Sequence, residues 1–271
     1  MPARFTLSSL SHQWAIFLML FGAGTTVHAD DTTSTTALVV LIGGFDSDPS
    51  PAQLNGTIPR GRGNSGMYQL AGDLRETGLR AEYFNWNGTR AGELNRPGEP
   101  PTPRGIATYI REARERLQCR RLVVIGNSWG GHSACEVCEH LQSDPPVEID
   151  LLLLLDPSST GRETPVPTAV SANVRQVTSY CTRNMFVWGK WLEDERITHI
   201  DLGDVNQPFY RRGVGYEARF NFQAHVAAEW DEQIHADICQ RVLGVSRSSP
   251  PESAGSGTGK SSETAVSSAG K

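Results

Sequence analysis

A serine between two glycines, in the run G-N-S-W-G at Gly126–Gly130, is the first feature of the chain that could do chemistry. An apolar, β-branched stretch from Leu122 to Ile125 precedes it, and a helix-compatible stretch from His132 to Leu141 follows it. A serine hydroxyl is a weak nucleophile, and a strained strand-turn-helix junction lifts it clear of a sheet towards a base and a substrate. Side chains in place of the glycines would collide at such a turn. The run therefore predicts Ser128 as a nucleophile, with an ordinary exposed serine in a glycine-rich turn as the alternative.

The elements that must position this serine alternate between two kinds. Apolar runs predict strands over residues 36–44, 79–86, 122–125, 149–155, 174–181 and 197–202. Helical spacing predicts helices over residues 65–77, 102–117, 132–141 and 226–243, with Ser65 as a cap and Gly78 and Gly244 as stops. Strands that read as continuous apolar runs between helices are buried on both faces. The expected fold class is α/β, with a doubly wound, mostly parallel sheet and helices on both faces.

Both ends of the 271-residue chain differ from its middle. Residues 1–29 predict a secretory signal, with Arg4, a short apolar run and the cleavage pattern Val27-His28-Ala29, so the mature chain is expected to begin near Asp30 in a secreted or periplasmic location. Its apolar run is shorter than the roughly 20 residues of a membrane span, so the mature chain is expected to have none. Residues 246–271 lack aromatics and predict a disordered tail. Residues 30–245, about 215 in all, predict one domain.

The composition limits which classes of partner are expected. The formal net charge is -5 and no basic stripe is present, which excludes nucleic acid as the expected partner. Five cysteines leave at least one unpaired, and Cys135 and Cys138 share a helix face, where packing or a disulfide elsewhere is favoured over metal or redox chemistry. Two N-x-T triplets, beginning at Asn55 and Asn87, match the glycosylation acceptor of a eukaryotic protein. The oligomeric state stays open.

In a doubly wound sheet, function lies where the strands end. Asp156 follows the five-leucine strand, and His225 lies in an expected loop between the last strand and the final helix. The chain order Ser, Asp, His is that of a catalytic triad on such a sheet, so His225 is the predicted base and Asp156 the predicted acid. Asp156 also suits a turn, and the rival acids are Asp201, Asp204 and Asp194.

The other histidines fit the role of base less well. The chain has seven, of which two belong to the predicted signal, two lie on the helix after Ser128 and point along it, one lies in a strand and one lies inside the final helix: His12, His28, His132, His140, His199 and His235. His225 is therefore favoured over a surface or capping histidine.

These pieces resemble the α/β-hydrolases of the lipase and esterase type over most of residues 36–243. The matching pieces are G-G-F at Gly43–Phe45, G-N-S-W-G-G at Gly126–Gly131, L-D-P-S at Leu155–Ser158 and H-V at His225-Val226. The L-D-P position resembles that of pancreatic-type lipases, which have H-G-F where this chain has Gly43-Gly44-Phe45. The oxyanion-stabilising backbone amides are expected at Trp129 and at Phe45, with Gly44 as the second choice for the latter.

The resemblance implies an exported serine hydrolase that cleaves carboxylic esters, with lipid esters as one candidate class, through an acyl-enzyme. No metal or organic cofactor is expected, and the partner is a small-molecule or lipid ester. A thioesterase or amidase with the same triad, and an inactive binding module with this fold, stay open as alternatives. No large lid is expected within residues 157–173. An acyl pocket is weighed equally with core packing for five aromatic residues: Trp129, Trp188, Trp191, Phe209 and Tyr210.

Overall fold

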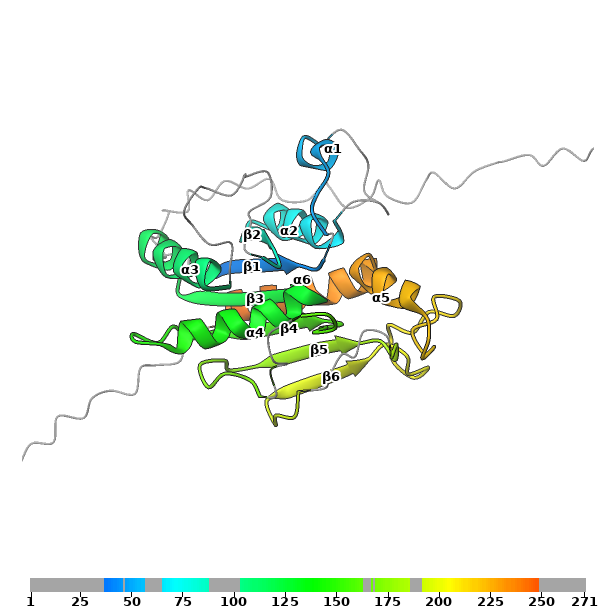
Figure 1. The fold of residues 1–271 in the computed structure, drawn as a ribbon. Coiled ribbons are helices and arrows are strands. Elements are labelled where there is room, and N and C mark those ends of the chain that lie inside the picture. Colours follow the sequence, from blue (N-terminus) through cyan, green and yellow to red (C-terminus); the bar gives the residue numbers. More distant parts are fainter. Residues whose placement is uncertain are drawn as a thin grey trace, which may run out of the picture. The chain divides into compact units, whose positions relative to one another are not determined.

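A computed structural model describes residues 37–45, 47–56, 65–87, 103–162, 167, 169–185 and 192–248, all within one compact unit. Six strands and six helices are found in these ranges (Figure 1). In chain order they are β1 Ala37–Gly43, α1 Pro51–Leu54, α2 Gly66–Glu76, β2 Arg80–Asn85, α3 Pro103–Leu117, β3 Arg121–Asn127, α4 Trp129–Gln142, β4 Leu151–Leu155, β5 Val177–Cys181, β6 Ile197–Asp201, α5 Phe222–Glu229 and α6 Glu232–Arg247.

The six strands form one sheet in the order β2-β1-β3-β4-β5-β6, and every neighbouring pair is parallel. All strands therefore end at the same edge, where the chain turns towards the predicted site. This arrangement confirms the predicted fold class. β4 and β5 begin two and three residues later than predicted, because Ile149 and Val174 form only an isolated bridge ahead of them.

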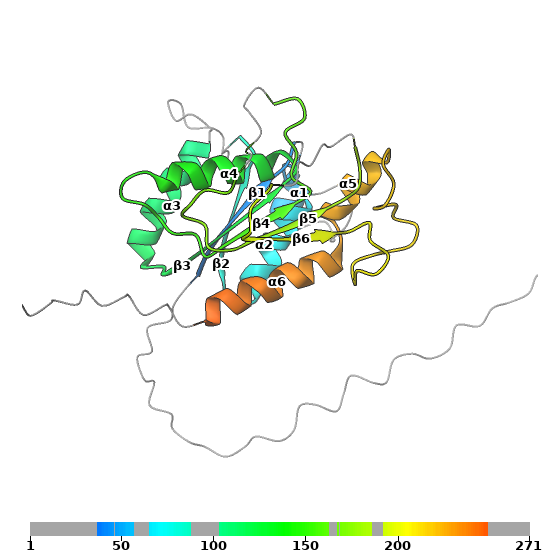
Figure 2. The ribbon, with the colours of Figure 1, turned by 90° about the horizontal axis from the view of Figure 1, so that it is seen from below.

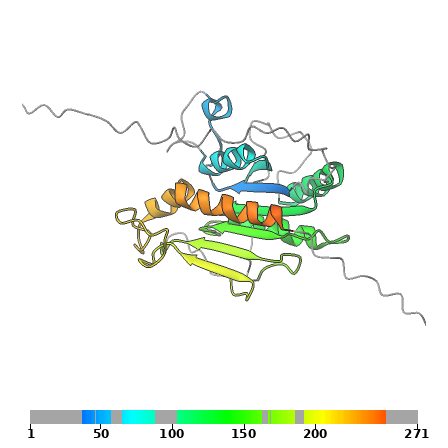
Figure 3. The ribbon, with the colours of Figure 1, turned by 180° about the vertical axis from the view of Figure 1, so that it is seen from behind.

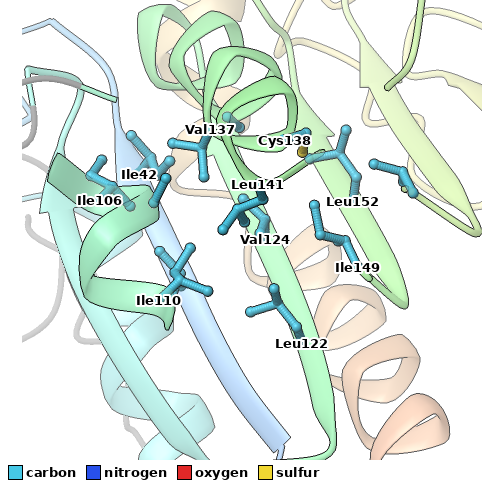
Figure 4. Close-up of a cluster of buried hydrophobic side chains, with 14 of the residues drawn as sticks. Ile42, Ile106, Ile110, Leu122, Val124, Val137, Cys138, Leu141, Ile149 and Leu152 are labelled. Atoms are coloured by element: carbon cyan, nitrogen blue, oxygen red, sulfur yellow. The ribbon is translucent and has the colours of Figure 1, made fainter. Parts of the chain in front are cut away.

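Helices cover both faces of the sheet, so that the molecule has three layers (Figure 2). On one face α3 and α4 pack over alternate strand residues, and Ile106, Ile110 and Leu141 belong to one buried cluster with Val124 and Leu152 (Figure 4). On the other face α2 and α6 cover the intervening residues (Figure 3). Burial of successive strand residues on opposite faces explains why the strands read as continuous apolar runs.

The C-terminal helix predicted over 226–243 is two helices. The side chain of Asp231 accepts hydrogen bonds from the backbone N–H groups of Gln233 and Ile234 and so begins α6, while α5 ends at Glu229. His225 consequently lies inside α5, not in the predicted loop. The Asp-Glu pair at 231–232 is an ordinary helix-start signal that lies inside an apolar pattern.

Gly244 does not end α6, which was the prediction; the helix continues to Arg247, past the domain boundary predicted at residue 245. Val242 and Val245 pack on the core on either side of Gly244, so continuing the helix past the glycine buries more apolar surface. Arg121 then donates to the backbone oxygen of Ser248 at 2.9 Å, which satisfies a carbonyl at the helix end.

Several predictions fall outside the described residues and stay predictions. They are the signal at 1–29, the tail beyond Ser248, the glycosylation triplets, which include Thr57, Gly88 and Thr89, and the pocket roles of Trp188 and Trp191. Within the described part of residues 157–173 there is no helix. The short helix α1, capped by Ser50, lies between the strand predicted over 36–44 and the helix predicted over 65–77, where neither was expected.

All five cysteines fall within the described ranges, and each is a free thiol, with only Cys239 partly exposed. The disulfide that the sequence left open for Cys135 and Cys138 is therefore not formed, and both side chains pack in the core cluster under α4. None of the helices in the described ranges is both long enough and apolar enough to cross a membrane.

Candidate active site

Ser128 lies at a sharp turn between β3 and α4. Its φ of 51° and ψ of -123° place a non-glycine residue in a strained region of backbone space. Its N–H donates to Leu155 C=O at 3.0 Å, and its C=O accepts from the N–H groups of Gly131 and Ser158, both at 2.9 Å. These bonds hold the strained residue in place, as a nucleophile on a strand-turn-helix junction requires.

Glycines permit the close approach of strand and helix at this turn. A Cβ atom at Gly126 would lie 2.4 Å from Gly130 O, and one at Gly130 would lie 2.2 Å from Ile42 O. No backbone atom can yield that much space without a shift of the helix or the strand. The two glycines of the motif are therefore required by packing, as predicted from the sequence.

The structure brings the three predicted side chains together. His225 Nε2 lies 2.9 Å from Ser128 Oγ, and His225 Nδ1 lies 2.7 Å from Asp156 Oδ2. The histidine comes from α5, which lies at the carboxyl end of the sheet (Figure 1). This is the geometry of a nucleophile with a base in reach and an acid that orients the base.

Asp156 follows β4 directly, with a φ of 44°, and is buried. Thr182, the residue after β5, donates to its carboxylate twice, from N–H to Oδ1 at 3.0 Å and from Oγ1 to Oδ2 at 2.8 Å. The carboxylate is thus compensated by hydrogen bonds and by the imidazole, which a buried charge needs. Thr182 was missed by sequence reasoning, although its place after a strand end could have indicated it.

The rival acids all have other partners. Asp201 pairs with Arg183 at 2.6 Å, Asp194 pairs with Arg196 at 2.5 Å, and Asp204 accepts from Asn206 N–H at 2.9 Å within a turn. The carboxylate that faces His225 is that of Asp156.

The loop after β1 lies against the serine. A Cβ atom at Gly44 would come within 2.9 Å of Ser128 Cβ, so the backbone of this loop borders the nucleophile directly. Ser47 N–H donates to Gly44 C=O at 3.4 Å and closes a turn that contains Phe45. Trp129 is the first residue of α4, and its N–H is one of the donors that a helix start leaves without a partner inside the helix.

Aromatic rings surround this part of the site. The Phe45 and Trp129 ring centroids lie 4.9 Å apart, Trp129 meets Trp86 at 4.8 Å, and Phe222 lies 5.5 Å from the His225 ring. Phe45 and Phe222 are exposed. Of the residues weighed for a pocket, Phe209 packs on Tyr180 with the core cluster instead.

His132, which was expected to point along its helix, is buried and contacts Ser159, with Nδ1 2.6 Å from Oγ. Burial, together with Arg162, lowers the pKa of His132 to about 4. Among the described residues, no group of three or more His, Cys, Asp or Glu side chains is arranged to hold a metal ion.

No protein-family model matches the sequence, and neither does any curated protein. Solved structures with a similar arrangement include a Xanthomonas campestris pv. campestris protein assigned to the α/β-hydrolase superfamily (17% identity, 75% of this chain and 98% of that one, TM-score 0.38). Another is a cutinase-like protein from Cryptococcus sp., with 11% identity over 78% of this chain and 95% of that one and a TM-score of 0.36. A third is the NocB thioesterase domain from the nocardicin cluster, with 14% identity over 78% of this chain and 94% of that one and a TM-score of 0.38. These neighbours are members of the α/β-hydrolase superfamily at low identity.

Proposed function

We propose that the protein is a serine hydrolase that cleaves carboxylic esters through an acyl-enzyme. One observation carries this proposal: Ser128, on a strained turn, is linked through His225 to the buried carboxylate of Asp156 by contacts of 2.9 and 2.7 Å. Hydrogen-bond reach between nucleophile, base and orienting acid is the requirement for nucleophilic acyl transfer.

In this mechanism Ser128 Oγ attacks the ester carbonyl carbon while His225 Nε2 takes the hydroxyl proton. Asp156 holds the imidazole in the tautomer that carries hydrogen on Nδ1 and stabilises the imidazolium that forms. The carbonyl oxygen becomes an oxyanion, for which the backbone N–H groups of Trp129 and Phe45 are the proposed donors. His225 then protonates the leaving alkoxide, and the alcohol departs from the acyl-enzyme.

Water completes the cycle. His225 removes a proton from a water molecule, which attacks the acyl carbon, and the second tetrahedral intermediate collapses with return of the proton to Ser128. The acid is released and the enzyme is restored. The predicted signal segment adds the proposal that this enzyme is exported, and N-terminal sequencing of the mature protein, expected to begin at Asp30, tests it.

A fluorophosphonate reagent, with intact-mass measurement, tests the activated serine. We expect one adduct on the wild type and none on Ser128→Ala. Ser159→Ala is the matched control, because Ser159 also contacts a buried histidine, and it should be labelled like the wild type. A folded wild type without an adduct, or an adduct that persists in Ser128→Ala, would refute the proposal.

Substrate class is tested with one acyl group presented as an ester, a thioester and an anilide. We expect the largest kcat/KM for the ester. A preference for the thioester or the anilide would keep the triad and assign the protein to a thioesterase or amidase instead, because leaving-group preference depends on the pocket.

A further inference from the structure

We define the oxyanion loop as Gly43, Gly44, Phe45 and Ser47. Its first residue, which lies beside β2, is a glycine and has no side chain. A Cβ atom at Gly43 would lie 2.1 Å from Tyr83 Oη and 2.9 Å from its Cζ. The Tyr83 hydroxyl therefore occupies the space into which a side chain at residue 43 would extend. The glycine at this position, where the sequence departs from H-G-F, is required by the tyrosine on the neighbouring strand.

Tyr83 holds the far end of the same loop. It is buried, and its hydroxyl donates to the backbone oxygen of Ser47 at 2.6 Å. Burial raises the pKa of Tyr83 far above its ordinary value, so the hydroxyl keeps the proton that this bond needs. Ser47 in turn closes the turn back to Gly44, which borders Ser128.

A second contact links the loop to the helix that carries the base. Ser47 Oγ donates to Glu229 Oε2 at 3.3 Å, and the backbone N–H of Gly66, at the start of α2, donates to Glu229 Oε1 at 2.9 Å. Glu229 follows His225 by four residues in α5, so the two side chains share one face of that helix. One carboxylate therefore connects the loop, α2 and the helix of the base.

We infer that Tyr83 and Glu229 are positioning residues that fix the oxyanion loop beside Ser128, so that its Phe45 amide meets the developing oxyanion; the inference rests on the proposed function. Neither side chain touches the triad. Tyr83 acts through the Ser47 backbone oxygen and Glu229 through the Ser47 hydroxyl, while Glu229 also interacts electrostatically with His225. A preorganised donor of this kind stabilises the transition state more than the bound substrate.

Tyr83→Phe tests the first contact because it removes the hydroxyl and keeps the ring. We expect kcat for an ester to fall about tenfold with KM within about twofold, and the affinity for a trifluoromethyl ketone, which mimics the tetrahedral state, to fall by a similar factor. Tyr180→Phe is the matched control, since Tyr180 is a buried tyrosine whose hydroxyl donates to Asp237 on α6. Its kcat and inhibitor affinity should stay within about twofold of wild type.

A pair of variants tests the carboxylate. Glu229→Gln keeps an oxygen that can accept from Gly66, whereas Glu229→Ala removes the link. We expect about a tenfold loss of kcat in the alanine variant and recovery to within about threefold in the glutamine variant. Equal activity of the alanine variant and wild type would overturn the role of Glu229.

Different results would overturn the role of Tyr83 and the proposed hydrolase activity. Wild type that does not react with the fluorophosphonate overturns the proposed function. Wild type that reacts, together with a folded Tyr83→Phe that matches it in kcat and inhibitor affinity, overturns only the role of Tyr83. A Tyr83→Phe variant that loses thermal stability with unchanged kcat also overturns it, because that result describes a purely structural tyrosine.

Discussion

Ser128 contacts His225, which contacts Asp156, whereas Ser159 contacts His132, which faces Glu136. Both clusters hold a serine, a histidine and a carboxylate. In the first, the carboxylate lies 2.7 Å from the imidazole. In the second, the nearest approach between His132 and Glu136 is 3.7 Å, beyond hydrogen-bond length.

The surroundings of the two acids explain the difference. Among the described residues, the hydrogen bonds to the Asp156 carboxylate come from Thr182 and from the imidazole of His225, on which its charge acts. Glu136 accepts from Arg162 at 2.8 Å, and that arginine neutralises it. Arg162 also donates to Trp129 C=O at 3.0 Å, so the second cluster ties the loop after β4 to α4.

A serine, a histidine and a carboxylate in contact do not by themselves define a catalytic triad. Ser128 has a strained backbone, a helix start beside it and a glycine loop against it, which are the features that a nucleophile and its proposed oxyanion donors need. Among the described residues, Ser128 has a positive φ and Ser159 does not. This contrast supports the catalytic role that we propose for the cluster that contains Ser128.

The largest expected difference between the clusters comes from the acids. Asp156→Asn should lower kcat about 10⁴-fold, because an amide does not hold the productive imidazole tautomer. Glu136→Gln should change it by about twofold or less. Steady-state kinetics on the best ester measure both, and near-normal activity of Asp156→Asn would move the acid to another residue.

The next difference between the clusters is the effect of His132 on the stability of the fold at acid pH. Because the pKa of His132 is lowered to about 4, the unfolded chain takes up a proton at His132 below pH 6.5 that the folded chain does not. Stability that is present above pH 6.5 is therefore lost as the pH falls towards 4. Between pH 7 and pH 5 the wild type should lose about 2 kcal/mol more than His132→Asn.

Urea unfolding of both proteins at the two pH values measures this difference. Equal losses in wild type and His132→Asn would show that His132 takes up its proton in the folded state as readily as in the unfolded one.

The smallest effect concerns the support of the acid. Thr182→Val removes the hydroxyl that donates to Asp156 at 2.8 Å and leaves the backbone donor in place, so kcat should fall about fivefold. Thr178→Val, a change of another buried threonine within β5, is the matched control and should keep kcat within about twofold. A larger loss in the control than in Thr182→Val would contradict this account of the site.

The strands of the sheet, and the three residues of the cluster that contains Ser128, could be predicted from the sequence. Apolar runs marked each strand, and the rule that parallel strands end at one edge favoured Asp156 but left Asp201, Asp204 and Asp194 as rivals, because Asp201 also ends a strand. His225 was selected correctly as the residue that contacts Ser128, but for a wrong local reason, because it lies in a helix and not in a loop.

The supporting residues were not predictable by the same means. Tyr83 and Glu229 meet Ser47 across sequence separations of 36 and 182 residues, and nothing in the periodicity of β2 or α5 indicates those partners. The break between α5 and α6 was missed because the helix start at Asp231 lies inside a continuing apolar pattern.

The order of the elements along the chain has a consequence for the newly made protein. The six described strands all end by Asp201, and they include or directly precede Ser128 and Asp156, whereas His225 lies in α5. The base is 97 residues from its serine and 69 from its acid. Because synthesis proceeds from the N-terminus, a nascent chain that ends before α5 has its nucleophile without a base. The proposed activity would then begin only once the last helices have been made and have docked, and one proteolytic cut between β6 and α5 that releases them would end it.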